Sequence, residues 1–224
     1  MVIIKSIKEL NGKVGKSFSH ANRGLLFEEL ITSINHIYRR QKLGFIMKQY
    51  TPFMPYWDSA AGHMGKTFVR KQKDSDIAPD YLGVYQNIPL MFEAKHIKTS
   101  TFSFSLVQPH QHSYLKEFRS MGYMAFLFIS FNNERFYILP EEVYSAMENH
   151  GLSMKIMREN KSGKPHEGRY VYKVGFSEIE CKLPKYYSFK EEDINEFFKV
   201  SIIKHSDGYN YLDYMLEAKR IFGV

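Results

Sequence analysis

Cysteine is almost absent from this sequence, since Cys181 is the only one. A single cysteine excludes an intrachain disulfide and a zinc site built from several cysteines. The chain also lacks any apolar run of about 18 residues, which a membrane-spanning helix would need. Its first residues lack the apolar stretch of a signal peptide. We therefore expect a protein of the reducing cytoplasm that does not enter the membrane.

Aromatic residues and positive charge are plentiful by contrast. Aromatic side chains make up 16% of the 224 residues, and 31 Lys and Arg face 24 Asp and Glu, which gives a net charge of +7. With 44% hydrophobic residues the chain is long enough for one domain with a sizeable core. The basic balance favours a polyanionic partner such as nucleic acid.

The most informative stretch is a predicted hairpin. Its pattern of apolar and β-branched residues predicts one strand from Tyr81 to Gln86 and a second from Leu90 to Lys95. Asn87-Ile88-Pro89 is typical of a turn and would join them. The ends of the two strands would then lie side by side, so residues just before Tyr81 and near Lys95 would meet.

Charged groups gather at that end of the hairpin. Asp80 starts the first strand, and Glu93 and Lys95 share one face of the second because side chains alternate along a strand. Neighbouring carboxylates repel unless a cation lies between them. Oxygen ligands suit Mg²⁺ or Mn²⁺, and the Ala94 carbonyl is a further candidate ligand. Such an ion activates water, and Lys95 would either orient that water or stabilise the developing charge. The pattern predicts phosphodiester hydrolysis; the alternative is an ordinary surface ion pair.

A predicted helix from Ala21 to Lys42 and a strand from Phe45 to Tyr50 precede this hairpin. Glu28 and Glu29 lie in the first turns of the helix. Both carboxylates would favour the positive end of the helix dipole and face water. In the alternative interpretation one of them reaches the metal.

A second helix is predicted from Gln108 to Met121, with Pro109 in its first turn. Gln111 heads its buried face, so the amide would either reach the sheet end or bond backbone in the core. His110 and His112 flank it as candidate metal ligands, although hydrogen-bonding or exposed roles are commoner.

Residues 51–76 form an insert that we expect to be irregular. Basic residues alternate there with Trp57 and Phe68, a composition that suits contact with a DNA backbone. The alternative is a solvated loop held by its aromatic side chains. Residues 1–20 form a basic arm that would contact DNA or serve as a solubilising tail. The basic residues of the insert expected to bind DNA are Lys66, Arg70, Lys71 and Lys73.

Beyond these segments we expect a strand buried on both faces, a second strand that pairs with it, a loop, a third strand and three further helices. Ser188 and Glu191 form a capping-box pattern for one of these helices. We treat residues 151–224 as an extension of the same domain. The expected ranges are strands Tyr123–Phe131, Arg135–Leu139 and Tyr170–Phe176, a loop from Lys155 to Gly168, and helices Pro140–Asn149, Ser188–Val200 and Asn210–Ile221.

Several short motifs carry a family resemblance. They are Asn22-Arg23-Gly24 with Glu28, the run Asp80-Tyr81-Leu82-Gly83-Val84-Tyr85, then Phe92-Glu93-Ala94-Lys95, His110-Gln111 and Phe128-Ile129-Ser130-Phe131. In this order they resemble the restriction-endonuclease-like nucleases, and more narrowly the RecU-type Holliday junction resolvases. Pro79 departs from the family, where a threonine is usual before the aspartate. The resemblance is that of a divergent, phage-encoded member.

The resemblance implies an α/β fold with a mixed central sheet flanked by helices, a nuclease core over residues 21–150 and a projecting stalk at the insert. It implies metal binding by Asp80 and Glu93, catalysis by Lys95, a supporting role for Glu28 and a site role for Gln111. Arg23 joins the expected DNA-binding residues. It further implies a homodimer that cuts four-way junctions in recombination and repair. A sequence-specific restriction-type nuclease on the same core and a non-catalytic DNA-binding protein are the alternatives.

Overall fold

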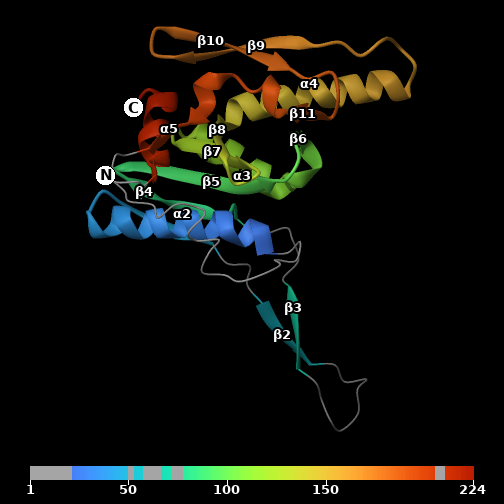
Figure 1. The fold of residues 1–224 in the computed structure, drawn as a ribbon. Helices are drawn as coiled ribbons and strands as arrows, with labels where there is room; N and C mark the ends of the chain where they lie inside the picture. The colour runs from blue at the N-terminus through green and yellow to red at the C-terminus, as the bar shows by residue number, and fades with distance from the viewer. Residues whose placement is uncertain (1–21, 50–52, 58–66, 72–77, 205–209) are drawn as a thin grey trace.

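The computed structural model describes residues 22–49, 53–57, 67–71, 78–204 and 210–224 (Figure 1). The expected basic arm of residues 1–20 lies outside the described residues. A mixed sheet forms the centre, in the strand order β1-β4-β5-β7-β8-β12. Its strands are β1 (Gly44–Lys48), β4 (Tyr81–Tyr85), β5 (Ile88–Ile97), β7 (Met124–Phe131), β8 (Arg135–Pro140) and β12 (Lys199–Val200).

Only the β5–β7 pair of this sheet is parallel. A parallel pair needs a crossover connection, and α3 (Pro109–Ser120) supplies it. All eight residues of β7 are buried, as predicted, because the strand is covered on both faces. Figure 1 shows α2 (Asn22–Arg40) on one side of the sheet and α4 (Glu141–Glu159) on the other. The expected α/β architecture with a mixed sheet between helices is therefore confirmed.

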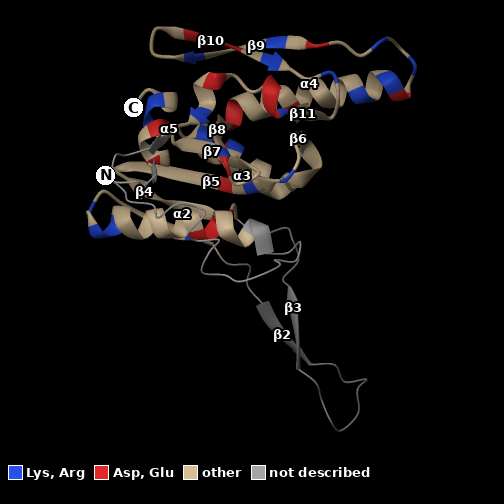
Figure 2. Ribbon diagram, in the orientation of Figure 1, with Lys and Arg blue, Asp and Glu red and all other residues tan. Residues whose placement is uncertain are grey.

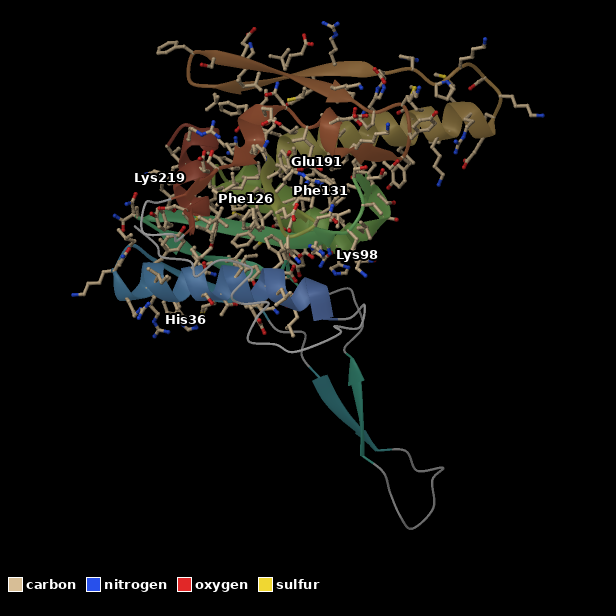
Figure 3. All side chains as sticks on the ribbon, in the orientation of Figure 1. His36, Lys98, Phe126, Phe131, Glu191 and Lys219 are labelled. Carbon is tan, nitrogen blue, oxygen red and sulfur yellow. The ribbon has the colours of Figure 1, made fainter. Side chains whose placement is uncertain are left out.

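A row of aromatic rings crosses the middle of the sheet. Tyr81, Phe92 and Phe126 are direct neighbours on β4, β5 and β7, and their rings stack at centroid distances of 4.6 and 4.9 Å. All three side chains are fully buried, and Figure 3 shows Phe126 in the packed interior. Stacked neighbours of this kind fix strand register. The row places the residue before Tyr81 opposite the residue after Phe92.

The hairpin between β4 and β5 turns one residue earlier than predicted. Gln86 and Asn87 have φ values of 47° and 66°, so they form the two-residue turn, and Ile88 already pairs with Tyr85. Two positive φ values mark the type I′ turn, whose twist suits a hairpin. The prediction that Ile88 and Pro89 belong to the turn was wrong, because Pro89 pairs with Val84 inside β5.

The insert contains regular structure that the sequence prediction missed. β2 (Phe53–Trp57) and β3 (Thr67–Lys71) pair antiparallel from Phe53 opposite Lys71 to Trp57 opposite Thr67. Their aromatic and β-branched residues are good strand formers, and Pro55 is tolerated in a ribbon with two free edges. Figure 1 shows this ribbon projecting away from the sheet, as expected of a stalk.

Helix α4 is longer than predicted and runs through Gly151 to Glu159. A Cβ atom on Gly151 would lie 2.6 Å from the carbonyl oxygen of Tyr186, so glycine allows the later chain to approach the helix closely. The hairpin of β9 (Gly168–Val174) and β10 (Ser177–Leu183) packs on α4. The predicted strand ends at Val174, and Phe176 lies exposed near the turn.

The predicted helix from Ser188 to Val200 was wrong. Ser188–Lys190 is strand β11, which pairs with β6 (Thr101–Ser103), because Phe189 is buried and its ring stacks on that of Phe102. Short 3-10 turns follow, η4 (Glu191–Asp193) and η5 (Glu196–Phe198), and a third, η3 (Phe104–Leu106), follows β6. The last helix begins later than predicted, since β13 (Ile202–Lys204) pairs with β14 (Asn210–Leu212) before α5 (Tyr214–Phe222).

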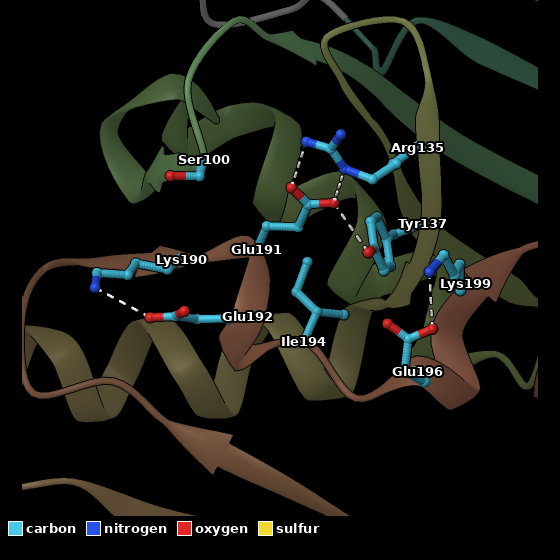
Figure 4. A pocket seen from close by; sticks show the side chains of 9 residues that line it. All are labelled: Ser100, Arg135, Tyr137, Lys190, Glu191, Glu192, Ile194, Glu196 and Lys199. Atoms are coloured by element: carbon cyan, nitrogen blue, oxygen red, sulfur yellow. Dashed lines mark hydrogen bonds and ion pairs between the residues drawn. The ribbon is translucent and has the colours of Figure 1, made fainter.

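The C-terminal segment is tied to the sheet by a charged cluster, drawn in Figure 4. The Arg135 guanidinium donates two hydrogen bonds to Glu191 at 2.5 and 2.9 Å, and the Tyr137 hydroxyl donates a third at 3.0 Å. A hollow of about 550 Å³ lies beside them. Its remaining lysines pair with Glu192 and Glu196. Because its positive and negative side chains pair with one another, we interpret this cluster as a structural contact between β8 and η4.

No helix within the described ranges has both the length and the apolar character needed to cross a bilayer.

Candidate active site

Asp80 and Glu93 lie next to each other where β4 begins. The Glu93 carboxylate accepts a hydrogen bond from the backbone N–H of Asp80 at 3.0 Å. The Asp80 carboxylate accepts one from the backbone N–H of Ala94, also at 3.0 Å. Each acid is thereby held by the backbone of the other strand. The register fixed by the aromatic row is the reason, because it sets Asp80 opposite Glu93.

Glu93 is a buried carboxylate, with only 1% of its side chain exposed. Burial raises its pKa to about 7, the nearby Asp80 carboxylate adds to the rise, and Lys95 opposes it. The Lys95 ammonium lies 2.7 Å from Oε1 of Glu93. A buried acid beside a second acid is the environment in which a bound cation most favours the charged form.

Gln111 reaches the same carboxylate from α3. Its Nε2 donates to Oε1 of Glu93 at 2.7 Å, while its own Oε1 accepts from the backbone N–H of Gln108 at 3.0 Å. The backbone bond orients the amide, so the NH₂ group faces Glu93. The sequence left open whether this glutamine bonds backbone or reaches the sheet end, and it does both.

Glu28 lies on α2 and pairs with Lys48 at the end of β1. The backbone carbonyl of Glu28 accepts a hydrogen bond from the Tyr81 hydroxyl at 3.4 Å. Lys48 is directly opposite Tyr81, the residue after Asp80. Sequence reasoning did not single out Lys48, because its position depends on the pairing of β1 with β4. Its place as the last residue of a strand that follows α2 was the available signal.

The sequence makes His110 and His112 candidate metal ligands, although hydrogen-bonding or exposed roles are commoner for histidine. In the portion of the chain that the structure describes, no cluster of three or more His, Cys, Asp or Glu residues could hold a metal ion. His112 lies instead between two glutamates of α4. The donor set of Asp80 and Glu93 nevertheless fits Mg²⁺ or Mn²⁺, which bind through one or two carboxylates and complete their shell with water and substrate phosphate.

The structure describes only part of the residues expected to bind DNA. Lys66 and Lys73 are outside the described residues. Arg23 lies in the first turn of α2, and Arg70 and Lys71 lie in β3, with their backbones alone described. Figure 2 shows Lys and Arg in blue and leaves these segments grey.

Comparison with known proteins identifies relatives. The sequence profile of the family "RecU: Recombination protein U" matches residues 22–167. The chain is 26% identical to the Holliday junction resolvase RecU of Mycoplasmopsis pulmonis, over 62% of this chain and 82% of the relative. It is 26% identical to the protein of the same name from Streptococcus mutans, over 67% and 79%, and 31% identical to that from Leuconostoc mesenteroides, over 58% and 64%.

The solved structures that are similar include the Holliday junction resolvase Hjc of Archaeoglobus fulgidus. It is 17% identical and covers 29% of this chain and 52% of its own, with a TM-score of 0.25, which is too low to support an argument. The family match is decisive, because it spans more than half of the chain and includes Asp80, Glu93, Lys95 and Gln111. The chain therefore belongs to the RecU family of Holliday junction resolvases.

Proposed function

We propose that Asp80 and Glu93 hold a catalytic Mg²⁺ or Mn²⁺ ion with which this enzyme cuts the strands of a four-way DNA junction. Membership of the RecU family makes the chain a structure-specific endonuclease of DNA recombination. The observation that carries the site assignment is the reciprocal clamp, in which each carboxylate is bound by the backbone of the other strand. Two neighbouring acids held this way fit the one or two carboxylates through which Mg²⁺ is usually bound.

The surrounding residues prepare that position. Gln111 and Lys95 both donate to Oε1 of Glu93, which stabilises the charged form of a buried acid. A divalent ion bound there supplies an activated water and offsets charge on the scissile phosphate. The Lys95 side chain is 21% exposed and its ammonium contacts Oε1 of Glu93, so it can orient that water or stabilise the developing charge.

Glu28 is proposed as a supporting acid. It lies on α2 and pairs with Lys48, which is opposite Tyr81, the residue after Asp80. We propose that it supports the metal site, where it would bind the ion or help to orient the groups that do.

The projecting ribbon of β2 and β3 is proposed to enter the junction. Arg23, Lys66, Arg70, Lys71 and Lys73 would contact phosphates, which position a protein on DNA without reading sequence. The ribbon lies in the chain between β1 and β4 and projects away from the sheet (Figure 1), which supports this assignment.

A homodimer is proposed because a four-way junction offers two symmetric strands to cut. Phe45 and Val84 are direct neighbours on β1 and β4, and with Met47 they are 42–47% exposed on the outer part of the sheet. An apolar strip at this place suits a contact with a second copy.

Residues 151–224 are proposed to extend the nuclease domain, which the pairing of β12 with β8 and of β11 with β6 supports. A cytoplasmic location is proposed from the single cysteine, which is buried. A phage origin stays a prediction.

Asp80→Asn tests the proposed site. The amide cannot supply the charge that the ion needs, so cleavage of a synthetic four-way junction should fall below detection while junction binding persists. Unimpaired cutting by this variant would refute the assignment.

Linear duplex DNA tests the restriction-type alternative, which requires discrete sequence-dependent fragments. A lack of any cleavage with either Mg²⁺ or Mn²⁺ would favour a non-catalytic binding protein.

A further inference from the structure

His112 lies on α3 and contacts side chains of α4, and the proposed catalytic site does not include it. Its Nδ1 lies 2.9 Å from Oε2 of Glu148, and its Nε2 lies 3.2 Å from Oε1 of Glu141 and 2.7 Å from Oγ of Ser145. The imidazole is 17% exposed. Both ring nitrogens therefore meet acceptors on α4, which requires the doubly protonated ring to satisfy all of them.

The neighbours of the two glutamates support a charged imidazole. Ser145 donates to Glu141, and the hydroxyls of Tyr144 and Tyr187 donate to Glu148 at 3.4 and 3.3 Å. Burial alone would lower the pKa of His112, but the hydrogen bonds to Glu141 and Glu148 outweigh it and raise the pKa to about 9. The cation is thus present at neutral pH.

We call His112 with Glu141 and Glu148 the charged clamp. The contacts of α3 connect this charged clamp to the active site. His112 follows Gln111 directly, and neighbouring helical residues point in directions about 100° apart. Gln111 reaches Glu93 in the sheet, whereas His112 reaches α4. The first turn of α3 is consequently held from two sides by charged hydrogen bonds. A small rotation of this turn would lengthen the 2.7 Å bond between Gln111 and Glu93, and such bonds weaken steeply with misalignment.

We propose that His112 is a positioning residue, which with Glu141 and Glu148 fixes the first turn of α3 so that the Gln111 amide stays on Glu93. The inference rests on the proposed role of Gln111 and Glu93. It links Glu141 and Glu148 of α4 to the active site through His112.

A merely structural ion pair is the competing interpretation, and the chain offers a matched control. Arg119 and Glu142 also join α3 to α4, at 2.8 Å, but at the last turn of α3. If helix anchoring in general supports activity, Arg119→Gln should affect cleavage as much as His112→Gln. If the charged clamp acts through Gln111, only the His112 variant should do so.

The test is a double-mutant cycle on the single-turnover rate of cleavage of a synthetic four-way junction. We expect His112→Gln to lower the rate about tenfold with unchanged junction affinity, and to cause no further loss in a Gln111→Ala background. Arg119→Gln should leave the rate within about twofold of the wild type. Glu148→Gln, which keeps the imidazole in place, should show a smaller loss in the same direction and serves if His112→Gln does not fold.

Three outcomes would overturn the inference. They are an equal fold-loss for His112→Gln with and without Gln111, an equal loss in Arg119→Gln, and full activity of Gln111→Ala. None of them touches the assignment of Asp80 and Glu93, because Asp80→Asn tests that assignment separately.

Discussion

Single residues show how the site could be read from the sequence and where that reading failed. Asp80, Glu93 and Lys95 were predictable together, because a short turn and a two-residue period bring them to one end of one hairpin. Lys48 was not, since its place depends on which strand pairs with β4. The contacts of His112 were equally hidden, because nothing local in the sequence says that α4 covers that face of α3.

The charge of His112 gives a residue-scale prediction about pH. Its folded-state pKa of about 9 exceeds the ordinary 6.5, so the folded protein binds the proton more tightly than the unfolded chain. The resulting stabilisation is complete below pH 6.5 and is lost as the pH rises through about 9. The shift corresponds to roughly 3 kcal/mol.

Urea unfolding of wild type and His112→Gln measures this effect. The difference in unfolding free energy should be largest at acidic pH and should shrink between neutral pH and the folded-state pKa of about 9. Arg119→Gln provides a control, whose difference should not change over that interval. A difference for His112→Gln that grows with pH would contradict the charged clamp.

At the scale of elements, register is what makes the site. The stacked rings of Tyr81, Phe92 and Phe126 fix the alignment of three strands, and a slip of one residue would move Glu93 to the opposite face. Strand existence was predictable from alternation and apolar runs. The ends of elements were not, because they depend on contacts distant in sequence. Helix α4 runs on through Gly151, where the chain at Tyr186 approaches it closely. Phe189 is buried in a strand rather than in the expected helix.

Gly83 gives a prediction about the β1–β4 pairing. A Cβ atom there would lie 2.2 Å from the carbonyl oxygen of Phe45, so Gly83→Ala must push the backbones of the two strands apart. We expect a loss of unfolding free energy of about 1–3 kcal/mol or more, as overpacking usually causes.

Gly163→Ala is the matched control for Gly83→Ala. Its added methyl group would meet the flexible side chain of Met157 at 3.0 Å, which can move, so the change should be much smaller. Chemical denaturation measures both variants. Equal stability of Gly83→Ala and wild type would show that β1 does not pair with β4 as described.

At the scale of the whole molecule, the proposals of DNA binding and of a dimer rest on net charge and on exposed apolar surface. The net charge of +7 suits a polyanion. The family resemblance in the sequence led to the dimer, whereas the exposed strip of Phe45, Met47 and Val84 required the structure, because only the fold shows which strand faces stay uncovered.

The dimer prediction concerns this strip. Val84→Lys places a charge opposite Phe45 in the proposed contact, so light scattering should detect monomers where the wild type gives dimers. Paired incision of a junction should be lost, leaving single nicks. Val171→Lys, a change at a residue of β9 that is 43% exposed, is the control and should remain dimeric. A dimeric Val84→Lys protein would place the contact elsewhere.

The account as a whole depends on one ion shared by two acids. Titration with Mn²⁺, followed by the paramagnetic resonance of the free ion, tests this directly in wild type, Asp80→Asn and Glu93→Gln. We expect the wild type to bind the ion and each single variant to lose the same site. Undiminished Mn²⁺ binding by either variant would contradict the shared site.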